Sequence, residues 1–307
     1  MGDPLRRVRH DLVYYPFRLL LAGGSRVPLA FTRPLGILAG RLALALARTD
    51  RRRAREHLAI AFPEKPDADR EVLLRHTARH LGLMLAEVLW LWRTDPQEVR
   101  GQVSMVGAEH LEAARARGRG AVLVTGHCGN WELMNARLGA GGIPMSIAVR
   151  EVYDPRLHEV ATALRARFGA QVISRGPTAG RRLVASLLAN RVVGLLIDQD
   201  IRDIPGVFVP FFGHPAWTPS GAAQLALRAR VPVVPAFISR AADGTHKVEV
   251  RPPIEPTGDA GDPNAVTRLT AEATNAIEQQ IRAHPEQWVW MHRRWRTRPE
   301  PAVRNDD

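Results

Sequence analysis

The sequence contains almost no cysteine and almost no lysine. Cys128 is the only cysteine among the 307 residues, which excludes an intrachain disulfide and a cysteine-based zinc site. Lysine occurs only at positions 65 and 247, so arginine carries nearly all of the net charge of +12. Genome composition can produce such a skew, but the resulting surface also attracts phosphorylated lipids, phosphopantetheine carriers or nucleic acid. Apolar residues (45%) and charged residues (24%) occur at ordinary globular levels, which excludes wholesale disorder.

The N-terminal part lacks an uninterrupted apolar run of the roughly 20 residues that a bilayer-spanning helix needs. Residues 11–48 are rich in apolar side chains, yet an arginine interrupts them every seven or eight positions, which gathers the arginines on one side of a helix. A signal-peptide cleavage pattern is also missing, so we do not expect an exported protein. The interrupting residues are Arg18, Arg26, Arg33, Arg41 and Arg48.

Three prolines predict breaks in this segment. Pro16, Pro28 and Pro34 should divide it, and Pro34 suits the first turn of a helix over 34–48. Such an amphipathic helix lies either in the headgroup region of a membrane or against the domain's own core. The basic run 51–53 that follows is most often typical of a solvated face, but beside an amphipathic segment it also suits an anionic bilayer.

Residues 54–100 predict helices that are separated near Pro63 and Pro66. From residue 107 onward, short β-branched runs alternate with segments of helical length, which predicts an α/β fold with a mixed, mostly parallel sheet flanked by helices. The expected strands are 121–125, 145–149, 172–174, 192–197, 231–238 and 248–250, and the expected helices are 130–140, 155–168, 178–190, 218–230 and 264–284.

The main candidate for chemistry is the run TGHCGNWE at 125–132, which follows a strand and precedes a helix. Asn130 suits the helix N-cap, and Glu132 falls in the favourable first turn. A turn between His127 and Glu132 can fold the imidazole onto the carboxylate, which would fix its tautomer and leave the other nitrogen free to accept a proton. The alternative is a capping His and Glu without chemistry. Cys128 suggests a thiol nucleophile only weakly, because neighbouring side chains usually point apart.

Motifs of several other enzyme classes are missing. The sequence contains no G-x-S-x-G of a serine hydrolase, no G-x-G-x-x-G that opens a helix and no Walker loop. Interleaved Trp and Arg at the C-terminal end allow a nucleic-acid hypothesis, but no recognisable binding module accompanies them.

The octapeptide resembles the H-x4-(D/E) motif of the glycerolipid and lysophospholipid acyltransferases. Five further blocks are similar to those of the bacterial lipid A late acyltransferases, in the same order along nearly the whole chain. The departures from the pattern are His57, where Asn is usual, and Gly126, where many members have Asn. The blocks are EHLAIAFP at 56–63, LIDQD at 196–200, GVFVPFFGHPAWT at 206–218, VPVVP at 231–235 and PEQWVWMHRRW at 285–295.

This resemblance implies transfer of a fatty acyl group from a thioester to a hydroxyl of a lipid A precursor, with His127 as general base and Glu132 orienting it. The implied donor is acyl carrier protein or coenzyme A, with no other cofactor and no metal. The acceptor is an anionic lipid at the cytoplasmic face of the cell inner membrane, and nucleic acid is not expected as a partner. A phosphatidylinositol mannoside or a lysophospholipid remains an alternative acceptor, and a non-catalytic basic binding protein remains an alternative of another class.

Further residues are expected to bind substrate at the ends of strands, where α/β sheets place ligands. Arg150 can bind a phosphate or a carboxylate bidentately, or it is only a surface charge. Asp198 could form an ion pair with Arg150, and Asp200 could position the acceptor. Arg175 is a weaker anion-binding candidate, and Asn130 is included among the substrate-binding residues. The expected organisation is a membrane-associated segment over 1–53, an acyltransferase domain over 54–299 and a polar tail over 300–307.

Overall fold

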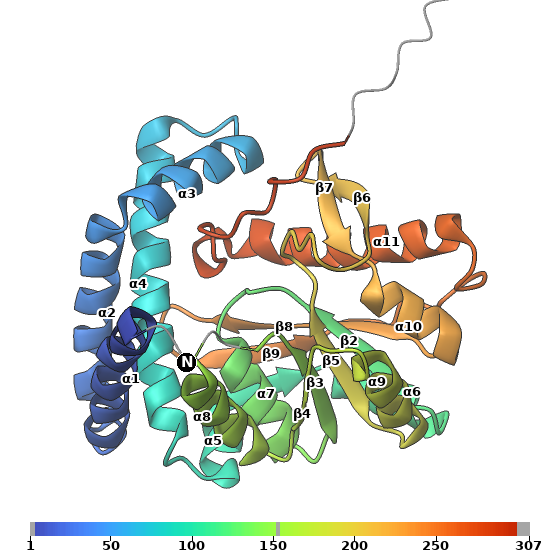
Figure 1. Cartoon of the computed structure of the whole chain (residues 1–307), viewed down its shortest axis with the longest axis horizontal. Coiled ribbons are helices and arrows are strands. Elements are labelled where there is room, and N and C mark those ends of the chain that lie inside the picture. The colour runs from blue at the N-terminus through green and yellow to red at the C-terminus, as the bar shows by residue number, and fades with distance from the viewer. Residues whose placement is uncertain (1–3, 152–153, 300–307) are drawn as a thin grey trace, which may run out of the picture.

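The computed structural model describes residues 4–151 and 154–299, and the expected polar tail over 300–307 lies outside them. Figure 1 shows the described helices up to residue 91 to the left of the strands and the later helices packed around the strands. The helices are α1 (Pro4–Gly24), α2 (Leu29–Leu46), α3 (Arg48–Ala61), α4 (Asp67–Leu91), α5 (Pro96–Gln102), α6 (Ala108–Ala116), α7 (Trp131–Ala140), α8 (Pro155–Ala166), α9 (Ala179–Leu188), α10 (Gly221–Ala229), α11 (Pro263–Ala283) and the 3-10 turn η1 (Pro285–Gln287).

Within the described residues, seven strands form the main sheet, in the order β1-β9-β8-β2-β5-β3-β4. Strands β2, β3, β4, β5 and β8 run parallel, while β9 is antiparallel to β8 and carries β1 alongside it. This arrangement confirms the predicted α/β class with a mostly parallel sheet. The strands are β1 (Val103–Val106), β2 (Ala121–Thr125), β3 (Met145–Val149), β4 (Gln171–Ser174), β5 (Val192–Leu196), β8 (Val233–Arg240) and β9 (His246–Val250).

Both faces of the sheet are buried. Along β2, Val122 and Val124 face a core shared with α9, α10 and α11, whereas Ala121 and Leu123 face a core shared with α5, α6, α7 and α8. Successive strand side chains point to opposite faces, so a strand covered on both sides must be apolar at every position. This explains why the β-branched runs predicted the central strands well.

The block at 206–218, which resemblance alone singled out, forms a β-hairpin of β6 (Gly206–Phe211) and β7 (His214–Pro219). Phe212 (φ 51°) and Gly213 (φ 75°) make the two-residue turn, and two positive φ angles are what such a tight hairpin turn requires. The Phe212 N–H donates to Glu278 Oε2 at 2.6 Å, which attaches the turn to α11.

Two of the three predicted chain breaks are wrong. Only Pro28 lies between helices, while Pro16 lies inside α1 and Pro34 lies inside α2. Each internal proline removes one backbone hydrogen bond but leaves the remaining bonds of the helix in place. In α2, packing against α4 supports the continuous helix, which starts at Leu29 rather than at Pro34.

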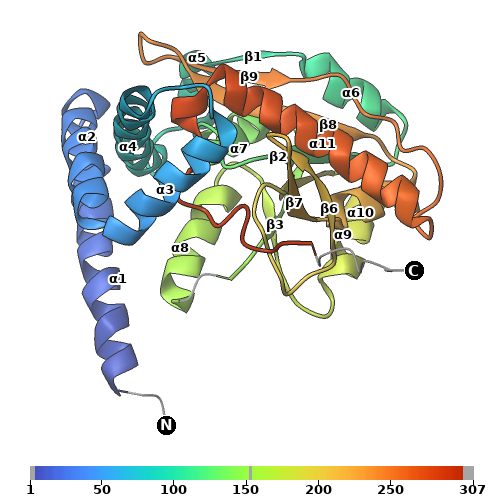
Figure 2. The same ribbon diagram turned by 90° about the horizontal axis from the view of Figure 1, so that it is seen from above.

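Helices α2 and α4 approach each other closely because glycines line their contact. A Cβ atom on Gly36 would lie 2.3 Å from the Gly82 carbonyl oxygen, and one on Gly40 would lie 2.1 Å from the Ala78 carbonyl oxygen. Small residues spaced four apart on both helices allow this backbone contact. Figures 1 and 2 show α1 and α2 outside α4, on the side away from the sheet.

This contact predicts a strong effect of a single methyl group. In Gly82→Ala the new Cβ would meet the Gly36 carbonyl oxygen at 2.0 Å, so the helices must separate and the free energy of unfolding should fall by about 1–3 kcal/mol. Gly23→Ala in α1, where nothing lies within 4 Å of the new Cβ, is the matched control and should be neutral or slightly stabilising. Urea denaturation followed by circular dichroism measures both; equal stability of the two variants would contradict the close packing.

Candidate active site

The parallel strands bring the predicted site residues to one edge of the sheet. His127 follows β2, Arg150 follows β3 and Asp198 follows β5, and β5 lies between β2 and β3. The carboxyl ends of parallel strands meet at the same edge, where open α/β sheets bind their ligands. The chain order of these residues thus gives no hint of which pair is adjacent, whereas the strand order does.

His127 is held by Asp198 through two hydrogen bonds. The ring nitrogen Nδ1 lies 2.7 Å from Asp198 Oδ1, and the His127 backbone N–H donates to Asp198 Oδ2 at 2.7 Å. Trp288 Nε1 also donates to Oδ2, at 2.8 Å. A carboxylate on Nδ1 fixes the tautomer that carries its proton there, and Nε2 is then the nitrogen that can accept a proton.

Asp198 remains ionised in this setting. Burial of its fully enclosed side chain alone would raise the pKa, but the nearby His127 with its hydrogen bond, the nearby His292 and the Trp288 hydrogen bond together hold that pKa well below its usual range. A permanently charged carboxylate next to the imidazole stabilises the imidazolium form that appears when Nε2 takes up a proton.

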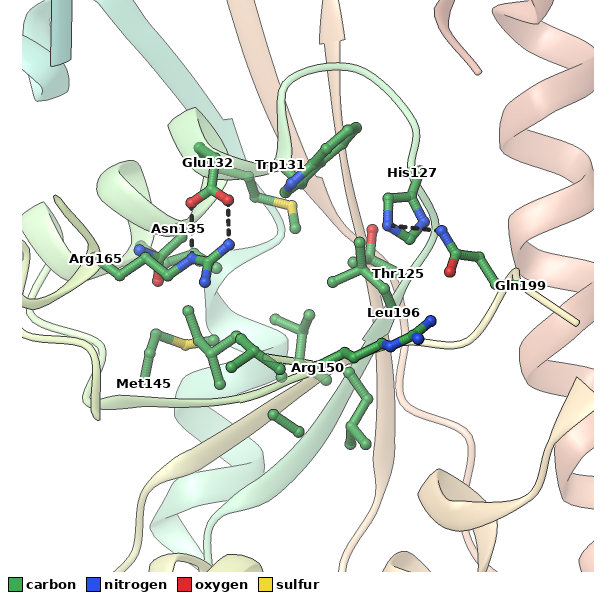
Figure 3. Close-up of a pocket in the computed structure, with 18 of the residues that line it drawn as sticks. Thr125, His127, Trp131, Glu132, Asn135, Met145, Arg150, Arg165, Leu196 and Gln199 are labelled. Atoms are coloured by element: carbon green, nitrogen blue, oxygen red, sulfur yellow. Dashed lines mark hydrogen bonds and ion pairs between the residues drawn. The ribbon is translucent and has the colours of Figure 1, made fainter. Parts of the chain in front are cut away.

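The expected contact between His127 and Glu132 is not the one that the structure shows. Glu132 forms a two-pronged ion pair with Arg165, with Nε to Oε2 at 3.0 Å and Nη2 to Oε1 at 2.5 Å. Figure 3 shows Trp131 between Glu132 and His127. The reason is local geometry: His127 precedes helix α7 and turns toward β5, whereas Glu132 lies in the first turn of α7 and points toward α8.

The other side of His127 faces two groups that we did not predict. Gln199 Nε2 lies 3.3 Å from His127 Nε2 and 3.0 Å from His292 Nδ1, and the two imidazole rings meet edge to face with centroids 4.6 Å apart. Burial, and then the proximity of His127, lower the pKa of His292 to about 4, so this ring is neutral at pH 7. The neutral His292 therefore adds no second positive charge next to His127 and Asp198.

Histidine, aspartate and histidine can also form a metal site, and ligand atoms of His127, Asp198 and His292 lie within 4.8 Å of one another. However, the two oxygens of Asp198 already accept hydrogen bonds from His127 and Trp288. This donor set favours a carboxylate that orients an imidazole over one that coordinates a cation.

A cavity of about 250 Å³ opens beside His127 and combines apolar walls with three arginines. Arg150 and Arg175 are exposed, whereas Arg165 is partly buried and paired with Glu132; Figure 3 shows Arg150 and Arg165. Partial burial and the charge of Arg150 lower the pKa of Arg175. The expected ion pair between Arg150 and Asp198 is wrong, because Asp198 is fully buried behind His127. Arg150 is thus open to an anionic ligand.

Two other residues expected to bind substrate are occupied within the protein. Asn130 is completely buried: its Oδ1 caps α7 by accepting the Leu133 N–H, and its Nδ2 donates to Glu87. Asp200 accepts hydrogen bonds from the backbone N–H and the hydroxyl of Thr297, at 2.5 and 2.9 Å. Asn130 therefore shapes the turn after His127, and Asp200 secures the C-terminal segment.

A buried network of charged groups contacts the turn that follows His127, through the hydrogen bond between Glu87 and Asn130. Glu87 of α4 forms a two-pronged ion pair with Arg240 of β8, and both side chains are more than nine-tenths buried. His246 Nε2 lies 3.4 Å from Glu87 Oε1. Because Glu87 also accepts from Asn130 at 2.9 Å, the network connects α4 and two strands to the N-cap of α7.

Cys128 lies on the far side of the same turn and is 3% exposed. Burial and the adjacent charge of Asp198 raise the pKa of its thiol, which suppresses the thiolate that a nucleophile needs. The residue instead pairs with Trp288 in an isolated β-bridge, and the neighbouring Gly129 N–H donates to Gln287 O at 2.8 Å. The C-terminal block thus closes directly onto the motif turn.

The model of the family described as bacterial lipid A biosynthesis acyltransferase matches residues 12–297. The chain belongs to this family. The match spans the N-terminal helices, the sheet and the C-terminal block, so the resemblance drawn from separate motifs is confirmed over their whole extent. The chain is accordingly an acyltransferase of the lipid A biosynthesis type.

Curated relatives agree with this assignment. The chain is 27% identical to the lipid A biosynthesis palmitoleoyltransferase of Escherichia coli over 267 residues, which cover 86% of this chain and 85% of that enzyme. It is 28% identical to the lipid A biosynthesis lauroyltransferase of the same organism over 273 residues, covering 87% and 85%. It is also 29% identical to the phosphatidylinositol mannoside acyltransferase of Mycobacterium tuberculosis over 248 residues, covering 78% and 76%.

Proposed function

We propose that this acyltransferase moves a fatty acyl group from a thioester donor to a hydroxyl of a lipid A precursor, with His127 as general base and Asp198 as the group that orients it. The observation that supports this role is the hydrogen bond between His127 Nδ1 and a fully buried carboxylate, at the mouth of an arginine-lined cavity. Acyl-transfer assays with variants of both residues test this role.

In the proposed reaction, the acceptor hydroxyl oxygen attacks the thioester carbonyl carbon while His127 Nε2 takes its proton. A new C–O bond forms, the C–S bond breaks, and the imidazolium returns the proton to the departing thiolate. Asp198 stays ionised throughout and stabilises the transient imidazolium. Glu132 acts at a distance from these atoms, by holding Arg165 in the wall of the cavity.

The arginines of the cavity fit the donor. Acyl carrier protein and coenzyme A both present the acyl group on a phosphopantetheine arm, and a guanidinium can bind its phosphate bidentately. The net charge of +12 also suits an acidic carrier protein. Steady-state measurement of kcat/KM, with the same acyl group carried either by acyl carrier protein or by coenzyme A, would distinguish the two donors.

Arg150 provides a specific test of donor binding. Arg150→Lys keeps the charge but removes the planar pair of N–H donors, so KM for the donor should rise roughly tenfold while kcat changes little. Arg228→Lys on the exposed part of α10 is the matched control and should behave as the parent enzyme. Unchanged KM in both Arg150→Lys and Arg150→Ala would leave Arg150 as an ordinary surface charge.

We further propose that α2 attaches the enzyme to a membrane surface. Among the described residues, α2 is the helix long and apolar enough to cross a bilayer by length and composition, and only 11% of it is buried inside the protein. One face carries large exposed apolar side chains, which soluble proteins rarely gather in one patch. These side chains are Phe31, Leu35, Leu38, Leu42 and Leu46.

Attachment through this face predicts a clear result in vesicle binding. Leu35→Glu combined with Leu42→Glu should weaken binding to anionic vesicles by about tenfold or more, because two apolar insertions are lost and charge is added. Leu188→Glu in α9, also a strongly exposed leucine, is the control and should bind normally. Co-sedimentation measures the partition; a double variant that still sediments like the parent would contradict attachment through α2.

A different lipid acceptor is the second candidate, because the mycobacterial relative that acts on phosphatidylinositol mannoside is as similar to the chain as the lipid A enzymes are. Lipid mass spectrometry of a deletion strain, with and without the restored gene, decides between the two. Loss of one acyl chain from lipid A supports the first candidate, and an unchanged lipid A with an altered glycolipid supports the second.

A further inference from the structure

A second and larger cavity, of about 1050 Å³, lies between α2, α4 and the turn that follows β8, and it shares no lining residue with the cavity at His127. Its charged lining is mostly basic. Four arginines face two carboxylates there, together with three histidines. The arginines are Arg33, Arg41, Arg79 and Arg240, and the carboxylates are Asp243 and Glu286.

Most of these positive charges have no counter-charge. Both carboxylates accept hydrogen bonds from neighbours in sequence, Asp243 from Thr245 and Glu286 from Gln287. In the described part of the chain, Arg41 and Arg79 form no ion pair. Arg33 donates to the Gly244 carbonyl oxygen at 3.2 Å rather than to a carboxylate. Burial lowers the pKa of Arg240, and the charges of Arg33 and Arg79 add to this effect against the opposing influence of Glu87.

The place of the cavity relative to α2 indicates what kind of molecule enters it. Arg33, Ile37 and Arg41 are four residues apart and share the cavity face of the helix. At 100° per residue, Arg41 lies about 60° from Leu38 at the edge of the exposed apolar face, whereas Arg33 lies on the opposite side of the helix. When that apolar face contacts lipid chains, the long side chain of Arg41 reaches the lipid headgroups, and the cavity leads from Arg41 to Arg33 and Arg79.

We propose that this cavity is a binding site for the phosphate group of an anionic lipid, separate from the acyl-transfer site. Arg33 and Arg79 supply charge-assisted hydrogen bonds to the phosphate oxygens. The site does not depend on the chemistry proposed at His127, because it binds its lipid without an acyl donor.

The test is calorimetric titration of the full chain with a short-chain phosphatidic acid below its micelle concentration, in the absence of donor. Arg33→Gln and Arg79→Gln should each weaken binding roughly tenfold. Arg75→Gln is the matched control, because it removes the same charge from an exposed position of α4 that does not line the cavity. It should bind as the parent does. Thermal melts verify that all three variants fold.

Two further titrations separate the sources of the phosphate. Short-chain phosphatidylcholine, which has no net charge, should bind more weakly than phosphatidic acid, and inorganic phosphate should compete with phosphatidic acid only weakly. Inorganic phosphate that binds as tightly as the lipid would overturn the lipid as the natural ligand. An equal loss of binding in Arg75→Gln, or no preference for phosphatidic acid over phosphatidylcholine, would overturn the site itself, whatever the outcome of transfer assays.

Discussion

Asp198→Asn should reduce kcat for acyl transfer by about 10²–10⁴-fold, close to the loss in His127→Ala. If the amide oxygen accepts from Nδ1–H, the amide NH2 faces the His127 N–H and the Trp288 N–H, which are both donors; if the amide turns over, its NH2 faces Nδ1 and favours the wrong tautomer. In neither orientation does the neutral amide stabilise the imidazolium as the carboxylate does. Because the two residues act as one unit, the double variant should be little worse than either single variant. Initial transfer rates with matched thermal melts measure these effects.

Two controls make this result specific. Glu132→Gln weakens the ion pair with Arg165, so it should act more on KM for the donor than on kcat. Cys128→Ala should keep most of the activity, because the thiol contributes to no step. A folded Asp198→Asn enzyme with the parent kcat would refute the orienting role, and an inactive, folded Cys128→Ala enzyme would restore the thiol as a candidate nucleophile.

The second large effect concerns stability. Arg240→Met should lower the free energy of unfolding by about 3–5 kcal/mol, because it leaves the carboxylate of Glu87 charged and buried without its main partner. Combining it with Glu87→Met should restore part of the loss, since the pair is then replaced by apolar side chains. Urea denaturation at pH 7 measures both variants. A single variant as stable as the parent would contradict a buried, structurally important pair.

The same pair predicts a direction for the pH dependence. Burial alone would raise the pKa of Glu87, but His246, Arg240 and Asn130 together lower it to about 2. A carboxyl whose pKa is lower in the folded state stabilises the fold above its unfolded pKa of about 4.3, and this stabilisation is lost as the pH falls toward 2. Arg240→Met should therefore shift acid unfolding to a higher pH.

The central strands could be predicted from sequence because a strand that is buried on both faces is apolar throughout. The strands β2 and β3 begin and end where the β-branched runs do. Strand β1 and helix α6 were missed, since each is short and only partly buried. The proline breaks were misjudged because tertiary packing, which local sequence does not contain, keeps α2 continuous through Pro34.

The candidate site was predictable in its members but not in its pairing. His127 and Asp198 were both singled out, yet each was assigned another partner. Proximity in sequence favoured Glu132, whereas the real neighbour lies 71 residues away and is placed by the contact between β2 and β5. Strand order depends on the whole sheet, so spacing in the sequence cannot reveal it. Gln199 carried a signal, because it stands between Asp198 and Asp200 in the strand-end block.

The closure of the C-terminal block onto the motif turn has a consequence for synthesis of the enzyme. Trp288 supplies a donor to Asp198, and Gln287 fixes the backbone of Gly129. Translation produces the motif turn more than a hundred residues before these two, so a growing chain lacks the contacts that fix Asp198 and Gly129. A chain that ends before residue 287 would therefore carry the motif without the segment that closes onto it, and only the full-length product would have the complete arrangement.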